Sequence, residues 1–184
     1  MRLVTSAVLA TLALTLSACG GDDPPPPEPT TSATTPANPD ATLPPMPEVA
    51  KEFTPNGAAT FVRHYVSLLG YAAATGDVEE LDRLSDPNCG GCSDYSDYFR
   101  KTYADGGWIR DRVWTNGETE LAFKDRAGSE SRATTTVTIA SGSLKSDSLA
   151  TPSDAPESSH VITFGLVFED AAWKISQLVA GEPA

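Results

Sequence analysis

The sequence predicts an α+β domain in which helices cover one face of an antiparallel sheet. Apolar residues recur at helical spacing between Thr54 and Ala104. After Gly107 the apolar period falls from about 3.6 to about 2 residues, which is typical of strands that have one buried face. Helices followed by a run of strands is the order that characterises this class. A signal peptide and a linker are expected before the domain.

The first segment, residues 1–18, is typical of a bacterial lipoprotein signal peptide. Arg2 precedes an uncharged apolar stretch from Leu3 to Leu16, which is too short to cross a bilayer as a stable helix. Leu16-Ser17-Ala18-Cys19 then resembles the lipobox, after whose cleavage the cysteine thiol receives diacylglycerol. We therefore expect Cys19 to carry the lipid anchor, with palmitate, and to hold the protein on the extracytoplasmic face of the cell membrane. An ordinary secretory signal with an incidental cysteine is the alternative.

Residues 19–50 are expected to form the lipid-attachment cysteine and a disordered linker. From Asp22 onward the segment consists almost entirely of Pro, Thr, Ser, Ala and acidic residues. Such a composition cannot bury enough apolar surface to offset the entropy of ordering. Fully extended, the linker would reach roughly 90 Å. The following residues, 51–180, are numerous enough for one domain with one core, and 181–184 form a tail.

The first expected helix has start and stop signals at both ends. Thr54 is a suitable N-cap, with Pro55 at the first helical position, and Gly76 can end the helix in the left-handed conformation. Its expected buried stripe contains Phe61, Val62, Tyr65, Val66, Leu69, Ala72 and Ala73, with Leu68 at the edge.

Two further helices are expected before the strands. Asp77 and Glu80 have the spacing of a helix start, and Pro87 ends that second helix. A third helix is expected from Ser93 to Ala104. Its aromatic residues are more typical of core packing than of an aromatic box, although both interpretations exist. They are Tyr95, Tyr98, Phe99 and Tyr103.

Three strands are indicated by two-residue alternation. They run from Thr134 to Ala140, from His160 to Phe168, and from Trp173 to Val179, the last two joined by a short turn. The polar segment from Ser141 to Ser159 contains two prolines and is expected to be a long exposed loop.

The segment from Trp108 to Lys124 allows two interpretations. Asn116-Gly117 is a strong hairpin signal, and a hairpin there would pair Trp114 with Thr119. One long strand with a bulge at Gly117 fits equally well. If the segment is extended, Arg110 and Arg112 share a face with the flanking tryptophans Trp108 and Trp114. They would then form a cation–π or anion-binding wall, or else the tryptophans pack in the core while the arginine stems reach outward.

The charge of the chain excludes nucleic acid as a partner. Its formal net charge is −12, with a pI near 4.4. Removal of Arg2 with the signal peptide changes the charge from −12 to −13. Binding to phosphate backbones needs an excess of Lys and Arg, which this chain does not have.

Cys89 and Cys92 are expected to form a structural disulfide, because an exported chain meets an oxidising environment. A disulfide that closes so small a loop contributes about 2 kcal/mol. A redox pair or half of a metal site are the alternatives.

His64 is expected at the rim of the core and His160 at the end of a strand. No metal, cofactor or catalytic residue is predicted, because neither histidine has an evident carboxylate partner in the sequence.

Five short runs together resemble an uncharacterised family of lipoproteins from high-GC Gram-positive bacteria, over roughly Met46 to Val179. They are Phe61-Val62-Arg63-His64-Tyr65, Tyr71-Ala72-Ala73-Ala74-Thr75-Gly76-Asp77, Cys89-Gly90-Gly91-Cys92, Gly106-Gly107-Trp108-Ile109 and Ala172-Trp173-Lys174-Ile175-Ser176. Domains of that family are similar to the nuclear transport factor 2-like (cystatin-like) fold, a curved sheet wrapped on helices to form a cone. The resemblance implies this fold and a membrane address, but no catalytic residues.

We expect the domain to bind a small apolar or amphiphilic ligand, or an envelope protein, without catalysis. The expected pocket lies between the first helix and the sheet. Its candidate residues are Tyr65, Tyr95, Trp108, Leu121, Phe164, Leu166, Trp173 and Ile175. The alternative is an enzyme similar to ketosteroid isomerases or dehydratases, which would need an inward carboxylate base. Asp111, Glu118 and Glu120 are candidates whose direction depends on the unsettled strand register.

Overall fold

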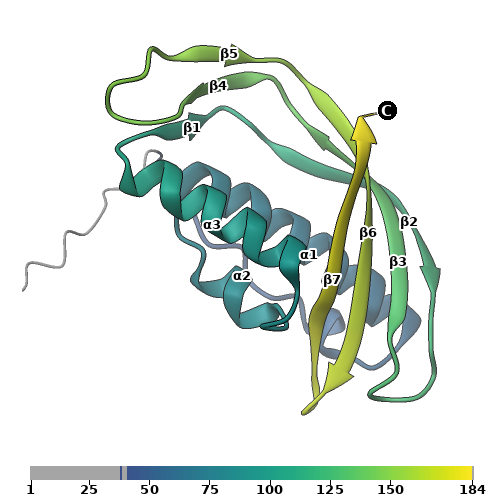
Figure 1. The fold of residues 1–184 in the computed structure, drawn as a ribbon. Helices are drawn as coiled ribbons and strands as arrows, with labels where there is room; N and C mark the ends of the chain where they lie inside the picture. The colour runs from purple at the N-terminus through teal and green to yellow at the C-terminus, as the bar shows by residue number, and fades with distance from the viewer. Residues whose placement is uncertain (1–37, 39–40, 184) are drawn as a thin grey trace, which may run out of the picture. The chain divides into compact units, whose positions relative to one another are not determined.

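Helices and strands separate into two layers in the computed structural model, which describes residue 38 and residues 41–183. The described helices are α1 (Pro55–Thr75), α2 (Glu79–Leu84) and α3 (Gly90–Ala104), with a 3-10 turn, η1 (Glu48–Lys51), before them. They lie inside the curve of the strands (Figure 1). The fold is the expected α+β cone. The signal peptide, Cys19 and most of the predicted linker lie outside the described residues.

The strands form two sheets. A four-stranded antiparallel sheet has the order β2-β3-β6-β7, with β2 (Trp114–Ala122), β3 (Ser131–Ile139), β6 (Ser158–Glu169) and β7 (Ala172–Pro183). A three-stranded sheet has the order β1-β4-β5, with β1 (Trp108–Arg110), β4 (Gly142–Lys145) and β5 (Ser153–Ala155). In Figure 1 the smaller sheet passes over the helices, and the larger sheet stands at their side.

Helix α1 has the expected bounds, because its end signals are local. The hydroxyl of Thr54 accepts the N–H of Gly57 at 2.9 Å, and Gly76 ends the helix with φ 77°. All eight residues of the expected apolar stripe are buried. They pack against inward side chains of β6 and β7, among them Phe164, Leu166 and Ile175, to form the core.

The other two helices begin at slightly different residues from those expected. Helix α2 begins at Glu79, and Asp77 lies before it, where Oδ1 of Asp77 accepts the N–H of Glu79 at 3.1 Å. Helix α3 begins at Gly90 instead of Ser93. The reason is a local cap: the sulfur of Cys89 accepts the N–H of Cys92 at 3.3 Å.

The segment around Asn116-Gly117 is one bulged strand, so the hairpin alternative is wrong. Both sides of the bulge pair with the same neighbour, β3, and the register shifts between Asn116 and Thr119. The hydroxyl of Thr135 donates to the carbonyl oxygen of Gly117 at 3.2 Å, inside the irregular stretch. A hairpin would have turned the chain back on itself, whereas the available partner strand stabilises a continuous extension.

The expectation of a long loop from Ser141 to Ser159 is also wrong. This segment contains β4 and β5, and β4 pairs with β1, so that Trp108 lies opposite Lys145. The polar sequence gave no two-residue period. The strand forms because β1, more than thirty residues earlier in the chain, offers it an edge.

The folded part also begins before Lys51, so the end of the predicted linker is ordered. Ala50 is buried and Met46 packs against the core. The indole N–H of Trp173 donates to the carbonyl oxygen of Glu52 at 3.0 Å, which ties this segment to β7. Within the described residues, no helix has the length and apolar character that crossing a membrane requires.

Candidate functional site

A cavity of about 180 Å³ lies where α3 and the two sheets meet. Helices α1 and α3 and strands of both sheets contribute to its wall. The residues that line it are Ala73, Tyr95, Tyr98, Phe99, Ile109, Arg112, Trp114, Ile139, Leu144 and His160. Most of these side chains are apolar or aromatic; Arg112 adds a guanidinium, His160 an imidazole, and Tyr95 and Tyr98 phenol hydroxyls.

Trp114 forms the aromatic centre of this wall. Its ring meets Tyr95 and Phe99 edge to face, at centroid distances of 6.0 and 6.3 Å. Strand pairing sets its place, because Trp114 lies opposite Ile139 at the start of β2. The indole nitrogen is buried, and no group in the described part of the chain accepts its N–H. A buried donor without an acceptor costs about 1–3 kcal/mol.

Arg112 lies at the junction between the two sheets. Its Nε donates to the carbonyl oxygen of Ala140 at 3.3 Å, and its Nη2 donates to the carbonyl oxygen of Pro156 at 3.2 Å. A third, longer contact joins Nη2 to the hydroxyl of Ser158 at 3.5 Å. The stem of Arg112 passes close to Gly142, where a β-carbon would stand 2.7 Å from its Cγ. The side chain is therefore held in place at the cavity wall.

The two histidines occupy separate environments. His160 lies on the inner face of β6 and lines the cavity. His64 is buried in α1 away from the cavity, and its Nε2 has no partner among the described residues. Burial lowers the pKa of His64; the nearby carboxylate of Glu80 opposes this shift, and Arg83 adds to it.

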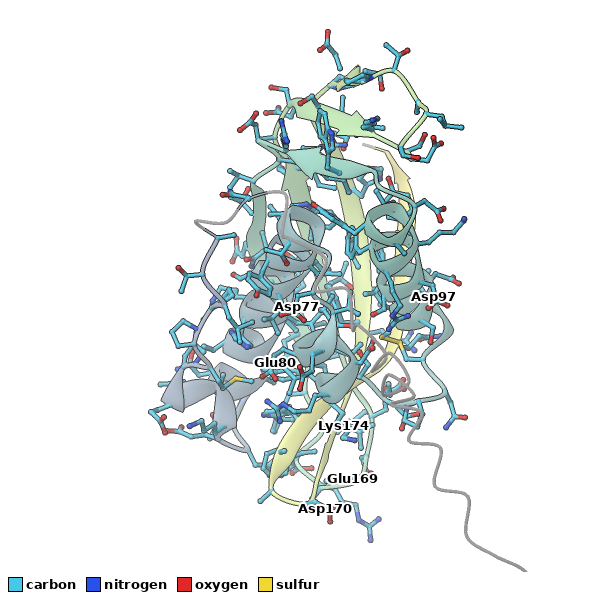
Figure 2. All side chains as sticks on the ribbon, turned by 90° about the vertical axis from the view of Figure 1, so that its left-hand side faces the viewer. Asp77, Glu80, Asp97, Glu169, Asp170 and Lys174 are labelled. Carbon is cyan, nitrogen blue, oxygen red and sulfur yellow. A yellow bond between two sulfur atoms is a disulfide. The ribbon has the colours of Figure 1, made fainter. Side chains whose placement is uncertain are left out.

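Carboxylates lie elsewhere on the domain. Figure 2 shows Asp77, Glu80 and Asp97 on the helical side, and Glu169 and Asp170 at the turn between β6 and β7. Among the described residues that line the cavity there is no Asp or Glu. Asp111, Glu118 and Glu120, which the sequence left as possible inward carboxylates, are exposed.

Of the eight residues that we expected in a pocket, the structure places Tyr95 in the cavity wall. The cavity lies nearer the smaller sheet than expected, because inward side chains of β6 and β7 fill the core beside α1, as Phe164 does against Tyr65. Five of the others are core residues with at most 2 % of their surface exposed: Tyr65, Phe164, Leu166, Trp173 and Ile175. Leu121 is half-buried against the same core, and Trp108 lies beneath the guanidinium of Arg110 at 4.3 Å.

Several lining residues were not predicted. Ile109, Ile139 and Leu144 come from β1, β3 and β4, and Leu144 belongs to the segment expected to be a loop. Its sequence signal was a leucine isolated in a polar stretch. Arg112 was considered for an anion-binding wall, and the aromatic residues of α3 for an aromatic box. Tyr95, Tyr98 and Phe99 line the cavity, although Phe99 is also part of the core.

The disulfide between Cys89 and Cys92 is confirmed. Both cysteines are buried, with 1 % and 2 % of their surface exposed, at the start of α3.

Larger hollows lie outside the cone. One of 390 Å³ lies beside the ends of α1 and α3, and one of 420 Å³ lies between residues 38 and 41–44, α1 and the segment 111–114. Neither has the aromatic enclosure of the smaller cavity.

Comparison with known proteins gives a family and a fold. The model of a family of unknown function, DUF6318, matches residues 28–179. The intermembrane space region of chloroplast protein ARC6 is similar in structure, with a TM-score of 0.51, 13 % identity, and coverage of 69 % of this chain and 95 % of that one. A putative calcium/calmodulin dependent protein kinase II association domain from Xanthomonas campestris has a TM-score of 0.45, 11 % identity, and coverage of 76 % and 94 %. Among curated proteins, no match was found.

Proposed function

This chain belongs to DUF6318, a family of unknown function, and we propose that its domain is a membrane-anchored module that binds a small amphiphilic ligand without catalysis. The observation that carries the proposal is the aromatic cavity between α3 and the two sheets. It combines an apolar wall with a few fixed polar groups, which is the usual composition of a small-molecule site.

The volume of the cavity limits the size of the ligand. An apolar cavity of about 150 Å³ is enough to bind benzene. The 180 Å³ observed here therefore suits a molecule with one ring and a small substituent. A whole lipid chain or a peptide segment would need more space than this cavity has, so a small molecule fits better than an envelope protein.

The composition of the wall favours binding over isomerase-like or dehydratase-like chemistry. A proton abstraction of that kind needs a positioned base within hydrogen-bond reach of the substrate. The described lining residues include no carboxylate, and nothing orients the imidazole of His160 for that role among the hydrogen bonds of the described chain. The residues around the cavity are instead suited to hold a ring and orient one polar end.

A filled cavity provides the direct test. Leu144→Phe adds a ring to the wall, whereas Leu121→Phe makes the same change on β2 away from the cavity. The full chain should bind benzyl alcohol, measured by tryptophan fluorescence and by NMR. Leu144→Phe should reduce that affinity at least tenfold, and Leu121→Phe should leave it unchanged. Equal loss in both variants, or no binding by the unsubstituted chain, would contradict the proposal.

Attachment to the membrane is proposed from the lipobox. Cys19→Ala removes the only thiol at that motif. We expect this variant to leave the membrane fraction or to keep an uncleaved signal peptide, as judged by fractionation and mass spectrometry. Normal cleavage together with unchanged membrane retention would contradict lipid attachment.

A further inference from the structure

Arg112 is a cation at the wall of the cavity, and no described residue gives it an anionic partner. Its Nε and Nη2 are occupied by the acceptors at Ala140, Pro156 and Ser158, none of which is charged. In the described part of the chain, its Nη1 has no hydrogen-bond partner, and no carboxylate forms an ion pair with its guanidinium. Two N–H donors with a positive charge therefore remain for a ligand.

A carboxylate suits these unpaired donors of Arg112. It accepts hydrogen bonds without donating any, and its charge is opposite to that of the guanidinium. It is therefore the simplest group that pairs with Nη1 of Arg112.

We propose that the ligand of this cavity is a small cyclic monocarboxylate, whose carboxylate binds Nη1 of Arg112 while its ring lies among Tyr95, Phe99 and Leu144. This inference rests on the proposed function and names its ligand class. Charge-assisted hydrogen bonds are about twice as strong as neutral ones, so the anionic end orients the ligand.

The acidic character of the chain does not oppose this assignment. The formal net charge of −12 is spread over the protein, and interactions between exposed charges are screened beyond about 8–10 Å at ordinary salt. Arg112 lines the cavity itself, so a carboxylate in contact with its guanidinium lies well inside that screening distance. The nearest charge therefore decides which ligand end is accepted.

Three probes of similar size share a benzene ring and differ in charge, so their affinities show the effect of the charge alone. Phenylacetate is an anion, benzyl alcohol is neutral, and benzylamine is a cation at pH 7. We expect the full chain to bind phenylacetate at least about tenfold more tightly than benzyl alcohol, and benzylamine most weakly. This order needs no variant, so it remains a test even if substitutions at Arg112 impair folding.

Variants then assign the preference to one side chain. Arg112→Gln should remove the preference for phenylacetate, and Arg112→Lys should keep part of it because the charge remains. Arg110→Gln is the matched control, since this arginine lies over Trp108 and does not line the cavity. Circular dichroism checks that each variant is folded. In NMR spectra the indole N–H signal of Trp114 should move with phenylacetate, while that of Trp173, bonded to Glu52, should stay.

The outcomes distinguish this inference from the proposed function. If benzyl alcohol binds as tightly as phenylacetate, or if Arg112→Gln keeps the preference, the carboxylate assignment is overturned while the binding module stands. If no probe binds and Leu144→Phe changes nothing, both are overturned.

Discussion

Gly91 lies so close to Leu178 that a β-carbon on the glycine would stand 2.0 Å from the carbonyl oxygen of Leu178. The first turn of α3 thus rests directly on the backbone of β7. Gly90, its neighbour between the same two cysteines, has nothing within 4 Å of such a β-carbon. The two glycines are adjacent in sequence, but only one of them is required by packing.

Gly91→Ala should therefore lower the free energy of unfolding, by about 1–3 kcal/mol, because overpacking forces backbone shifts. Gly90→Ala is the control and should leave stability unchanged or slightly raise it, since alanine favours helices over glycine. Urea denaturation measures both. Equal effects of the two substitutions would show that α3 does not contact β7 in this way.

Loss of the disulfide should destabilise the domain by about 2 kcal/mol in the chain-entropy description. The double variant Cys89→Ser with Cys92→Ala breaks the bond and keeps an acceptor for the N–H of residue 92. Cys89→Ala with Cys92→Ala also removes that cap, and should cost roughly 1 kcal/mol more. Thermal and urea unfolding compare the two. If both pairs are as stable as the unsubstituted protein, the disulfide is not structural.

Tyr65 should make the domain sensitive to alkali. Burial raises its pKa to about 12, and its hydroxyl shares a hydrogen bond of 2.8 Å with Ser85. The unfolded chain loses this proton near pH 10, so the folded state binds more protons between pH 10 and 12. The contribution of protonated Tyr65 to the free energy of unfolding is therefore fully present below pH 10. About 3 kcal/mol of it is lost as the pH rises towards 12.

Tyr65→Phe should reduce this alkaline loss of stability; the raised pKa values of Tyr71, Tyr95 and Tyr103 leave a remainder. Ser85 keeps a partner in the variant, since its hydroxyl also donates to the carbonyl oxygen of Leu81 at 2.7 Å. Tyr98→Phe, at an exposed tyrosine, is the control. Urea unfolding at pH 9, 10 and 11 gives the slopes. An identical slope for Tyr65→Phe and the unsubstituted chain would contradict the prediction.

His64 should cause a loss of stability in acid. Burial lowers its pKa in the folded state below the ordinary value of 6.5, so the unfolded chain binds a proton first as pH falls. The contribution of neutral His64 to the free energy of unfolding is fully present above pH 6.5 and decreases below that value. His64→Leu should reduce the acid slope, and should not destabilise the domain at pH 7 because the replaced Nε2 is buried without a partner among the described residues.

His160→Gln serves as the control for this measurement, since His160 lies in the separate cavity wall. Unfolding midpoints at pH 7, 6 and 5 compare the three proteins. A steeper acid slope for His64→Leu than for the unsubstituted chain would reverse the assigned direction of the pKa shift.

Local signals in the sequence were enough for the helices and for the alternating strands. Thr54, Pro55 and Gly76 act on backbone groups within a few residues, so the bounds of α1 follow from nearby chemistry. The disulfide was predictable for the same reason, because its two cysteines are three positions apart.

Only the tertiary structure decided where the cavity lies and which polar segment becomes a strand. Leu144 reaches the cavity because β4 pairs with β1, and Trp114 faces α3 because β2 continues through a bulge along β3. Those pairings join residues that are far apart in the chain. Whether an aromatic side chain fills the core, as Trp173 does, or borders a cavity, as Trp114 does, depends on the element that lies across from it, and no local pattern records that neighbour.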